Sequence, residues 1–190
     1  MKIDAHEFKE VLIFNNHSYK DSRGSFEESF RLDKINQAVN REICFCQDNL
    51  ARSKKGVIRG LHYQMPDHSQ SKLVSVIKGK VLDVIVDIRK GSPTFGKHIS
   101  IELCDTKKKC VFIPRGFAHG YITLSENSIF HYKVDNYYNA HSEAGIAYND
   151  PNLGINWRLS KSELLVSEKD KNHPLLKDAI LFDFNTNLYE

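Results

Sequence analysis

The chain has 190 residues, of which 41% are hydrophobic and 27% are charged. This composition excludes a disordered or fibrous protein, and the length suits one compact domain with a sizeable core, so we expect residues 1–190 to form a single domain. The formal net charge of +3 comes from 27 basic and 24 acidic residues, which is too even a balance to predict a nucleic-acid partner.

The cysteines indicate a reducing compartment. Cys44, Cys46, Cys104 and Cys110 form no C-x-x-C pair and no zinc-finger spacing, so reduced thiols are expected. No stretch approaches the roughly 18 apolar residues of a membrane span, and the N-terminus carries charges within its apolar part. We therefore expect a cytoplasmic protein with no membrane partner.

The N-terminal part is expected to combine short strands with one helix. The apolar run within residues 8–14 predicts a strand, and Gly24 in DSRGSFEESF predicts a tight bend. A helical pattern covers about Leu32 to Val39. The segment 42–50, EICFCQDNL, alternates apolar residues with cysteines and predicts a strand that ends in its polar triplet, 47–49.

Two strands separated by Gly79 are predicted from KLVSVIKGKVLDVIVDIR. In the first, Lys72 lies two residues before Val74 and four before Val76, so the three side chains share one face of the strand. If that face is buried, the amine of Lys72 points toward an enclosed side. An enclosed lysine is uncommon and requires a reason.

The second of these strands has one apolar face, at the even positions from Leu82 to Ile88. Its other face is mixed and carries Asp83 and Asp87. This pattern predicts a sheet that is packed on one side.

Short strands continue at the spacing of sandwiches and barrels, in HISIELCD, KKKCVFIPRGFAHGYITLSE and NSIFHYKVDNYY. In the last, Tyr132 shares a face with Phe130 and Val134, which suits either a functional hydroxyl or a core tyrosine with one hydrogen bond. Beyond Tyr148 the chain is rich in turns and short helical pieces, and Trp157 is expected to pack this tail onto the sheet. The fold class predicted is all-β.

The stretch RGLHYQMPDHSQSK, residues 59–72, contains the chemistry that a site needs. His62 can take or give a proton near neutral pH, and Lys72 offers a positive charge. A base beside a cation suits the removal of a proton next to a carbonyl, because the cation stabilises the enolate oxygen. Structural, metal-binding and anion-binding roles remain alternatives for these residues alone.

A metal site is the first rival, since the chain has nine histidines. Metal-dependent double-stranded β-helix proteins pair two histidines as H-x-H, whereas Gln64 stands at the partner position of His62, so no metal is expected. Neither a G-x-S-x-G elbow, nor a G-x-G-x-x-G or Walker loop, is present. Basic residues and the aromatic side chains of Tyr137 and Tyr138 suit a diphosphate and a nucleobase, which a sugar nucleotide would supply together. Each basic residue alone could equally be a solvated surface charge.

The motifs together resemble the dTDP-4-dehydrorhamnose 3,5-epimerase family over nearly the whole chain. They are DSRGSFEESF, FCQDNLARSKKGVIRGLHYQ, QSKLVSVIKGKVLDVIVDIRKGSPTFG, IPRGFAHG, FHYKVDNYY, YNDPNLGINW and SEKD. The resemblance implies a cupin-like jelly-roll β-barrel with short peripheral helices, which forms a homodimer and uses no metal and no cofactor. It implies action on a dTDP-4-keto-6-deoxyhexose, whose 4-keto group acidifies the protons on C3 and C5, in the synthesis of dTDP-rhamnose for cell-surface polysaccharides.

The resemblance also implies residue roles. His62 matches the general base, Asp170 in SEKD the carboxylate that pairs with it, Tyr132 the opposing acid and Lys72 the cation that stabilises the enolate. The positions expected to bind substrate are Arg23, Glu28, Gln47, Asn49, Arg59, His119, Tyr138, Glu143 and Lys169.

Two positions depart from the family pattern. His131 stands where an apolar residue is more common, and Arg158 follows Trp157 where proline is common. Relatives that invert only C3 or only C5, or that use another nucleotide sugar, therefore remain alternatives, as does a non-catalytic protein that only binds the sugar nucleotide.

Overall fold

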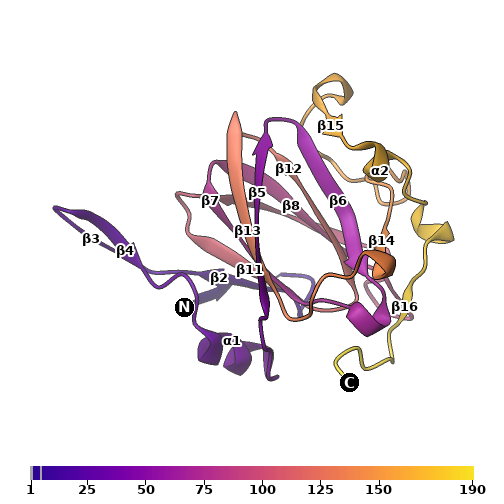
Figure 1. Ribbon diagram of the computed structural model, residues 1–190, viewed down its shortest axis with the longest axis horizontal. Coiled ribbons are helices and arrows are strands. Elements are labelled where there is room, and N and C mark those ends of the chain that lie inside the picture. The colour runs from indigo at the N-terminus through magenta and orange to yellow at the C-terminus, as the bar shows by residue number, and fades with distance from the viewer. Residues whose placement is uncertain (1, 5) are drawn as a thin grey trace.

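The computed structural model describes residues 2–4 and 6–190, and its strands form two main sheets that enclose a barrel (Figure 1). The first sheet has the order β1 (Lys2–Asp4), β2 (Leu12–Asn15), β11 (Lys109–Ile113), β7 (Lys72–Lys78), β13 (Asn127–Val134), β5 (Gln47–Lys54). The second has the order β10 (His98–Cys104), β8 (Lys80–Asp87), β12 (Phe117–Thr123), β6 (Val57–Gln64), β14 (Glu143–Gly145), with β15 (Leu165–Val166) parallel to β6.

The remaining elements lie around this barrel. Two small sheets pair β3 (Ser18–Asp21) with β4 (Gly24–Glu27) and β9 (Arg89–Lys90) with β16 (Phe182–Asp183). The helices are α1 (Leu32–Val39) and α2 (Glu168–Lys171), and the 3-10 turns are η1 (Pro66–His68), η2 (Ala140–Ser142), η3 (Lys161–Glu163) and η4 (Leu176–Asp178). The prediction of an all-β, cupin-like jelly-roll barrel with short peripheral helices is confirmed.

The barrel interior is apolar and receives side chains from both sheets. Val74 on β7 and Phe130 on β13 meet Ile85 on β8, and all three are fully buried. The parity argument for β7 and β13 therefore holds, because Val74 and Val76 face inward and Tyr132 packs against the same cluster. Lys72 and Tyr132 are thereby directed to the enclosed side of the first sheet.

Both faces of β8 are buried, which corrects the prediction that this sheet packs on one side. Ile85 faces the barrel interior, whereas Leu82 and Val84 contact a second apolar layer that includes Trp157. This layer is supplied by the C-terminal segment, which runs along the outside of the sheet (Figure 1). The periodicity of one strand cannot reveal a cover that lies about 70 residues further along the chain. Packing of the tail through Trp157 is confirmed.

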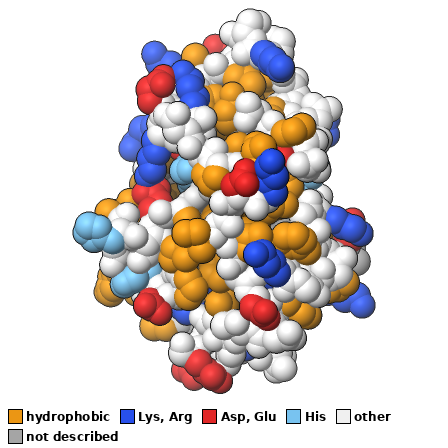
Figure 2. Space-filling model, turned by 90° about the vertical axis from the view of Figure 1, so that its right-hand side faces the viewer, with side chains coloured by type: hydrophobic (Ala, Val, Ile, Leu, Met, Phe, Trp, Pro, Cys, Tyr) orange, Lys and Arg blue, Asp and Glu red, His pale blue; other side chains and the backbone are white. Residues whose placement is uncertain are grey.

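The outer surface of this C-terminal layer is mixed in character. Figure 2 shows hydrophobic side chains between scattered acidic and basic ones on this face. Among residues 2–4 and 6–190, the structure contains no helix with the length and apolarity to cross a membrane. All four cysteines are free thiols.

The strand predicted for residues 42–50 lies later in the chain. The structure begins β5 at Gln47, where the prediction ended its strand, and continues it to Lys54. Ile43 and Phe45 instead pack beside α1, in a cluster that includes Ile35. The same cluster includes Phe14 and Leu73 of the first sheet, so this segment packs against a helix and a sheet without being a strand itself. Only tertiary structure separates these two cases.

The hairpin β3–β4 projects away from the barrel (Figure 1). Gly24, where φ is +132°, begins its second strand, in accord with the predicted bend. The hairpin carries the exposed aromatic rings of Tyr19 and Phe26. We call residues 18–27 the arm.

Candidate active site

A cavity of about 870 Å³ opens between the two sheets and the segment from η3 to α2. It is lined by side chains from β6, β7, β12, β13 and β14, which are distant in sequence. Eight of the thirteen residues expected at the site line it, namely Arg59, His62, Lys72, His119, Tyr132, Glu143, Lys169 and Asp170. The fold therefore collects most of the chemistry-bearing residues in one place.

His62 and Asp170 form a hydrogen-bonded pair at this cavity. Nε2 of His62 lies 2.7 Å from Oδ1 of Asp170, and the carboxylate also accepts a bond of 3.4 Å from the backbone N–H of Gly60. Asp170 is held on α2, where Ser167 caps the helix by accepting from the N–H of Asp170. Burial alone would raise the pKa of Asp170, but the hydrogen bond and charge of His62 lower it below its ordinary value. An ionised, buried carboxylate can thus orient the imidazole and stabilise its protonated form.

Lys72 and Tyr132 reach the cavity from the first sheet. Burial lowers the pKa of Lys72 to about 8, against the opposing charges of Asp83 and Glu143. Burial, followed by the neighbouring Tyr121, raises the pKa of Tyr132 above 10, so its phenol is protonated at neutral pH and can donate. Lys72 also donates a long bond of 3.4 Å to the carbonyl of His62.

A second histidine–carboxylate pair lies deeper in the barrel. Nε2 of His119 is 2.7 Å from Oδ1 of Asp83, and both side chains are buried. Burial lowers the pKa of His119 despite the charge of Asp83. Asp83 was not among the expected site residues. An acidic residue on the same face as Val81 and Ile85 was the signal that could have indicated it.

Other expected residues form the rim. The hydroxyl of Tyr138 donates to Oε2 of Glu143 at 2.6 Å, and the same oxygen pairs with Lys169. The backbone N–H of Tyr138 donates to Gln47, whose amide donates to Asn49 at 2.9 Å. Tyr138 is 52% exposed, so its ring is free to stack on a ligand. These residues adjoin the cavity through Glu143.

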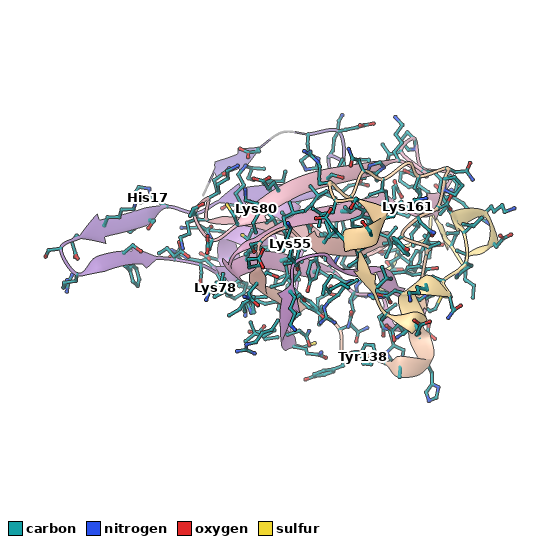
Figure 3. The ribbon with its side chains drawn as sticks, turned by 90° about the horizontal axis from the view of Figure 1, so that it is seen from above. His17, Lys55, Lys78, Lys80, Tyr138 and Lys161 are labelled. Atoms are coloured by element: carbon teal, nitrogen blue, oxygen red, sulfur yellow. The ribbon has the colours of Figure 1, made fainter. Side chains whose placement is uncertain are left out.

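Arg23 and Glu28 lie apart from the cavity of their own chain. The guanidinium of Arg23, on the turn of the arm, pairs with Asp21 at 2.6 Å and its side chain is 88% exposed. Glu28 pairs with Lys34 at 2.7 Å. Figure 3 shows His17, at the base of the arm, on the opposite side of the molecule from Lys161, which lines the cavity.

The two positions that depart from the family pattern, His131 and Arg158, are not among the residues that line the cavity. His131 is on the outer face of β13, where Oγ of Ser75 lies 3.4 Å from its Nδ1 and Asp48 lies 3.5 Å from its Nε2. Arg158 has a positive φ of 67° in the C-terminal segment.

His173 is a neighbour of the first pair that the sequence did not indicate. Its Nε2 lies 3.5 Å from Oδ1 of Asp170, and its ring meets that of His62 edge to face, with centroids 5.4 Å apart. Burial and the charge of His62 lower the pKa of His173. One ligand atom from each of His62, Asp170 and His173 lies within 4.8 Å of the others. Local spacing could not predict this group, because His62 and Asp170 are 108 residues apart.

Known proteins resemble this chain over almost its full length. Residues 5–178 match the family model described as dTDP-4-dehydrorhamnose 3,5-epimerase. The enzyme of that name from Shigella flexneri is 43% identical over 96% of this chain and 99% of its own length. The crystal structure of dTDP-6-deoxy-D-glucose-3,5-epimerase from Legionella pneumophila, in complex with dTDP-4-keto-L-rhamnose, has a TM-score of 0.93 and 41% identity, and covers 97% of this chain and 99% of its own.

A more distant relative has a narrower name. The dTDP-4-dehydrorhamnose 3-epimerase of Streptomyces niveus is 33% identical over 84% of this chain and 76% of its own length. The family match, the identity over full length and the shared fold agree with one another. The chain belongs to the dTDP-4-dehydrorhamnose 3,5-epimerase family.

Proposed function

We propose that this chain is a cofactor-independent epimerase that inverts C3 and C5 of dTDP-4-dehydro-6-deoxyglucose to give dTDP-4-dehydrorhamnose. The observation that supports it most is the pair formed by His62 and Asp170, 2.7 Å apart, at the same cavity as Lys72 and Tyr132. A base with an orienting carboxylate, a cation and a phenol are the groups that proton transfer next to a carbonyl requires.

The reaction proceeds through an enolate. His62 takes the proton from the carbon beside the 4-keto group, and the electrons of the broken C–H bond move to the keto oxygen. Lys72 stabilises the negative oxygen. When the carbonyl re-forms, Tyr132 delivers a proton to the opposite face of the carbon, which inverts it. His62 then releases its proton to solvent and Tyr132 regains one from solvent, and the second carbon beside the keto group is inverted by the same steps.

The nucleotide is held at the rim and by basic side chains. Arg59, His119 and Lys169 offer positive or donor groups to the diphosphate and sugar, and the exposed ring of Tyr138 stacks on the thymine. Gln47, Asn49 and Glu143 complete the polar rim around that ring. The dTDP-sugar named in the Legionella complex supports this class of ligand.

The chain acts as a homodimer in which the arm of one protomer reaches the cavity of the other. This assigns a role to Arg23 on the arm and to Glu28 directly after it, which do not line the cavity of their own chain. The exposed rings of Tyr19 and Phe26 on the arm suit burial against a partner. The outer face of the first sheet supports an interface too, since it carries the exposed Leu50 and Ile77.

Residues 1–190 act as one catalytic domain, and we place the protein in the cytoplasm. The four free thiols support a reducing compartment. The activity belongs to the synthesis of dTDP-rhamnose for cell-surface polysaccharides.

Incubation with dTDP-4-keto-6-deoxyglucose in heavy water tests this function. We expect deuterium at C3 and at C5, with inverted product. Incorporation at one carbon only would favour a mono-epimerase, for which the Streptomyces niveus relative is the precedent. Tight binding of the sugar nucleotide without any incorporation would instead favour a binding protein.

A further inference from the structure

His173 occupies a place that the backbone makes for it. A Cβ at Gly145 would lie 2.5 Å from Nε2 of His173, so only glycine on β14 leaves room for this ring. On its other side the ring meets the imidazole of His62. Nε2 of His173 is buried and makes no hydrogen bond with any described residue, although it lies 3.5 Å from the carboxylate of Asp170. A buried nitrogen without a partner is costly unless something occupies it at times.

The group of His62, Asp170 and His173 has the composition of a transition-metal site. Two imidazole nitrogens and one carboxylate oxygen are ligands that Zn²⁺ and its neighbours prefer, with a fourth position left for water. Asp170 and His173 are three residues apart at the end of α2, so they approach from one side, while His62 on β6 approaches from the other. Their ligand atoms lie within 4.8 Å of one another. Small side-chain movements would therefore bring all three atoms into contact with one ion.

We propose that His62, Asp170 and His173 bind a divalent transition-metal cation of the Zn²⁺ class, and that this cation inhibits turnover. The ion takes the place of the proton between His62 and Asp170, so binding releases a proton. With the ion on His62, the imidazole has lost the partner that prepares it to accept the substrate proton. Only this inhibitory half rests on the proposed epimerase function.

The surrounding charges make such binding weak enough to reverse. Lys72, Arg59 and Lys169 line the same cavity and oppose a cation, whereas Glu143, also in the lining, and Asp83 attract it. The site therefore differs from a structural metal centre, which is closed and fully neutralised. A chelator is expected to remove the ion and restore activity.

Metal binding is measured first, without substrate. Chelator-treated protein is titrated with Co²⁺ by visible absorption and with Zn²⁺ by calorimetry. The parent should bind one ion per chain. The Co²⁺ form should have the visible absorption spectrum of an ion bound by nitrogen and oxygen ligands. His173→Phe keeps an aromatic ring packed against Gly145 but removes both ring nitrogens. It should weaken the binding of Co²⁺ and Zn²⁺ by about tenfold or more.

Two further variants separate this site from other histidines. Gly145→Ala should also weaken binding, because the added Cβ displaces the ring of His173. The matched control is His98→Ala, on β10 and outside the lining of the cavity, which should bind like the parent. Equal affinity in the parent and in folded His173→Phe, or no binding by the parent, would overturn the proposal.

Inhibition is measured second, each variant being compared with its own metal-free rate. Zn²⁺ should inhibit the parent, chelation should reverse it, and His173→Phe should need about tenfold more Zn²⁺ or more. If the parent binds the ion at this site yet turns over at its metal-free rate, the inhibitory half is wrong. A protein with no turnover at all would refute the epimerase function, while the binding titration would still decide the metal site.

Discussion

His119, which lines the same cavity as His62, forms a buried pair with Asp83, with 2.7 Å between imidazole and carboxylate. Asp83 also acts on Lys72, because its negative charge holds the pKa of the Lys72 ammonium higher than burial alone would set it. The carboxylate thus helps to keep the proposed enolate-stabilising cation charged.

This coupling predicts the alkaline limb of the pH profile. The pKa of Lys72 is about 8 in the folded chain, so the ammonium loses its charge as the pH rises through that value, and kcat/KM should fall there. Asp83→Asn should move this fall to lower pH. The control Asp178→Asn, at an exposed position of η4, should leave it in place. An unshifted alkaline limb in Asp83→Asn would contradict the coupling.

Gly60 is predicted to tolerate no side chain. Its φ is +132°, and a Cβ there would lie 2.5 Å from Cα of Gly120 on the neighbouring strand. Gly60→Ala should lower the free energy of unfolding by about 1–3 kcal/mol, as overpacking usually does, and should disturb the N–H that Gly60 donates to Asp170. Urea unfolding measures the loss. Gly154→Ala is the control, since its φ of +59° is also positive but no neighbouring atom in residues 2–4 and 6–190 lies within 4 Å of the added Cβ. Equal losses in the two variants would show that the close approach does not matter.

His62→Asn is predicted to abolish exchange almost completely. A positioned general base typically contributes about a hundred- to ten-thousand-fold in rate, and the variant leaves Asp170 with no base to orient. Arg59→Ala should act mainly by raising KM, because it removes a ligand contact rather than the base. Heavy-water exchange at C3 and C5 separates the two. Near-normal exchange in His62→Asn would remove this residue from the role of base.

The dimer proposal predicts complementation between two inactive variants. Arg23→Glu damages the arm and leaves the cavity intact, whereas His62→Asn damages the cavity and leaves the arm intact. After subunit exchange, the mixture should recover about a quarter of the parent activity, because half of the dimers then hold one intact site. Recovery is measured against each variant alone. If the mixture stays inactive while sedimentation shows mixed dimers, the arm does not serve the partner.

Local patterns in the sequence predicted local structure well. The helix expected at Leu32 to Val39 has these bounds, and the break at Gly79 separates β7 from β8. The alternation of side chains along β7 and β13 placed Lys72 and Tyr132 on the enclosed side, and both line the cavity. Each of these features depends on neighbours within a few residues.

Features that depend on distant segments were missed. The second apolar layer over β8 comes from the C-terminal segment, and His173 meets His62 just after the helix that holds Asp170, which is 108 residues from His62. The alternation around Ile43 predicted a strand, but the segment only packs against α1 and the first sheet and forms no strand. No local periodicity contains this information.

The central claim is that one group removes the proton and a second group, across the cavity, returns it. Tyr132→Phe tests this most directly, since it removes only the hydroxyl and keeps the ring against Phe130. Deuterium in recovered substrate and the yield of inverted sugar are measured in the same heavy-water reaction. The account predicts that exchange by His62 continues while inverted product falls sharply. Inversion by Tyr132→Phe at the rate of the parent would contradict it.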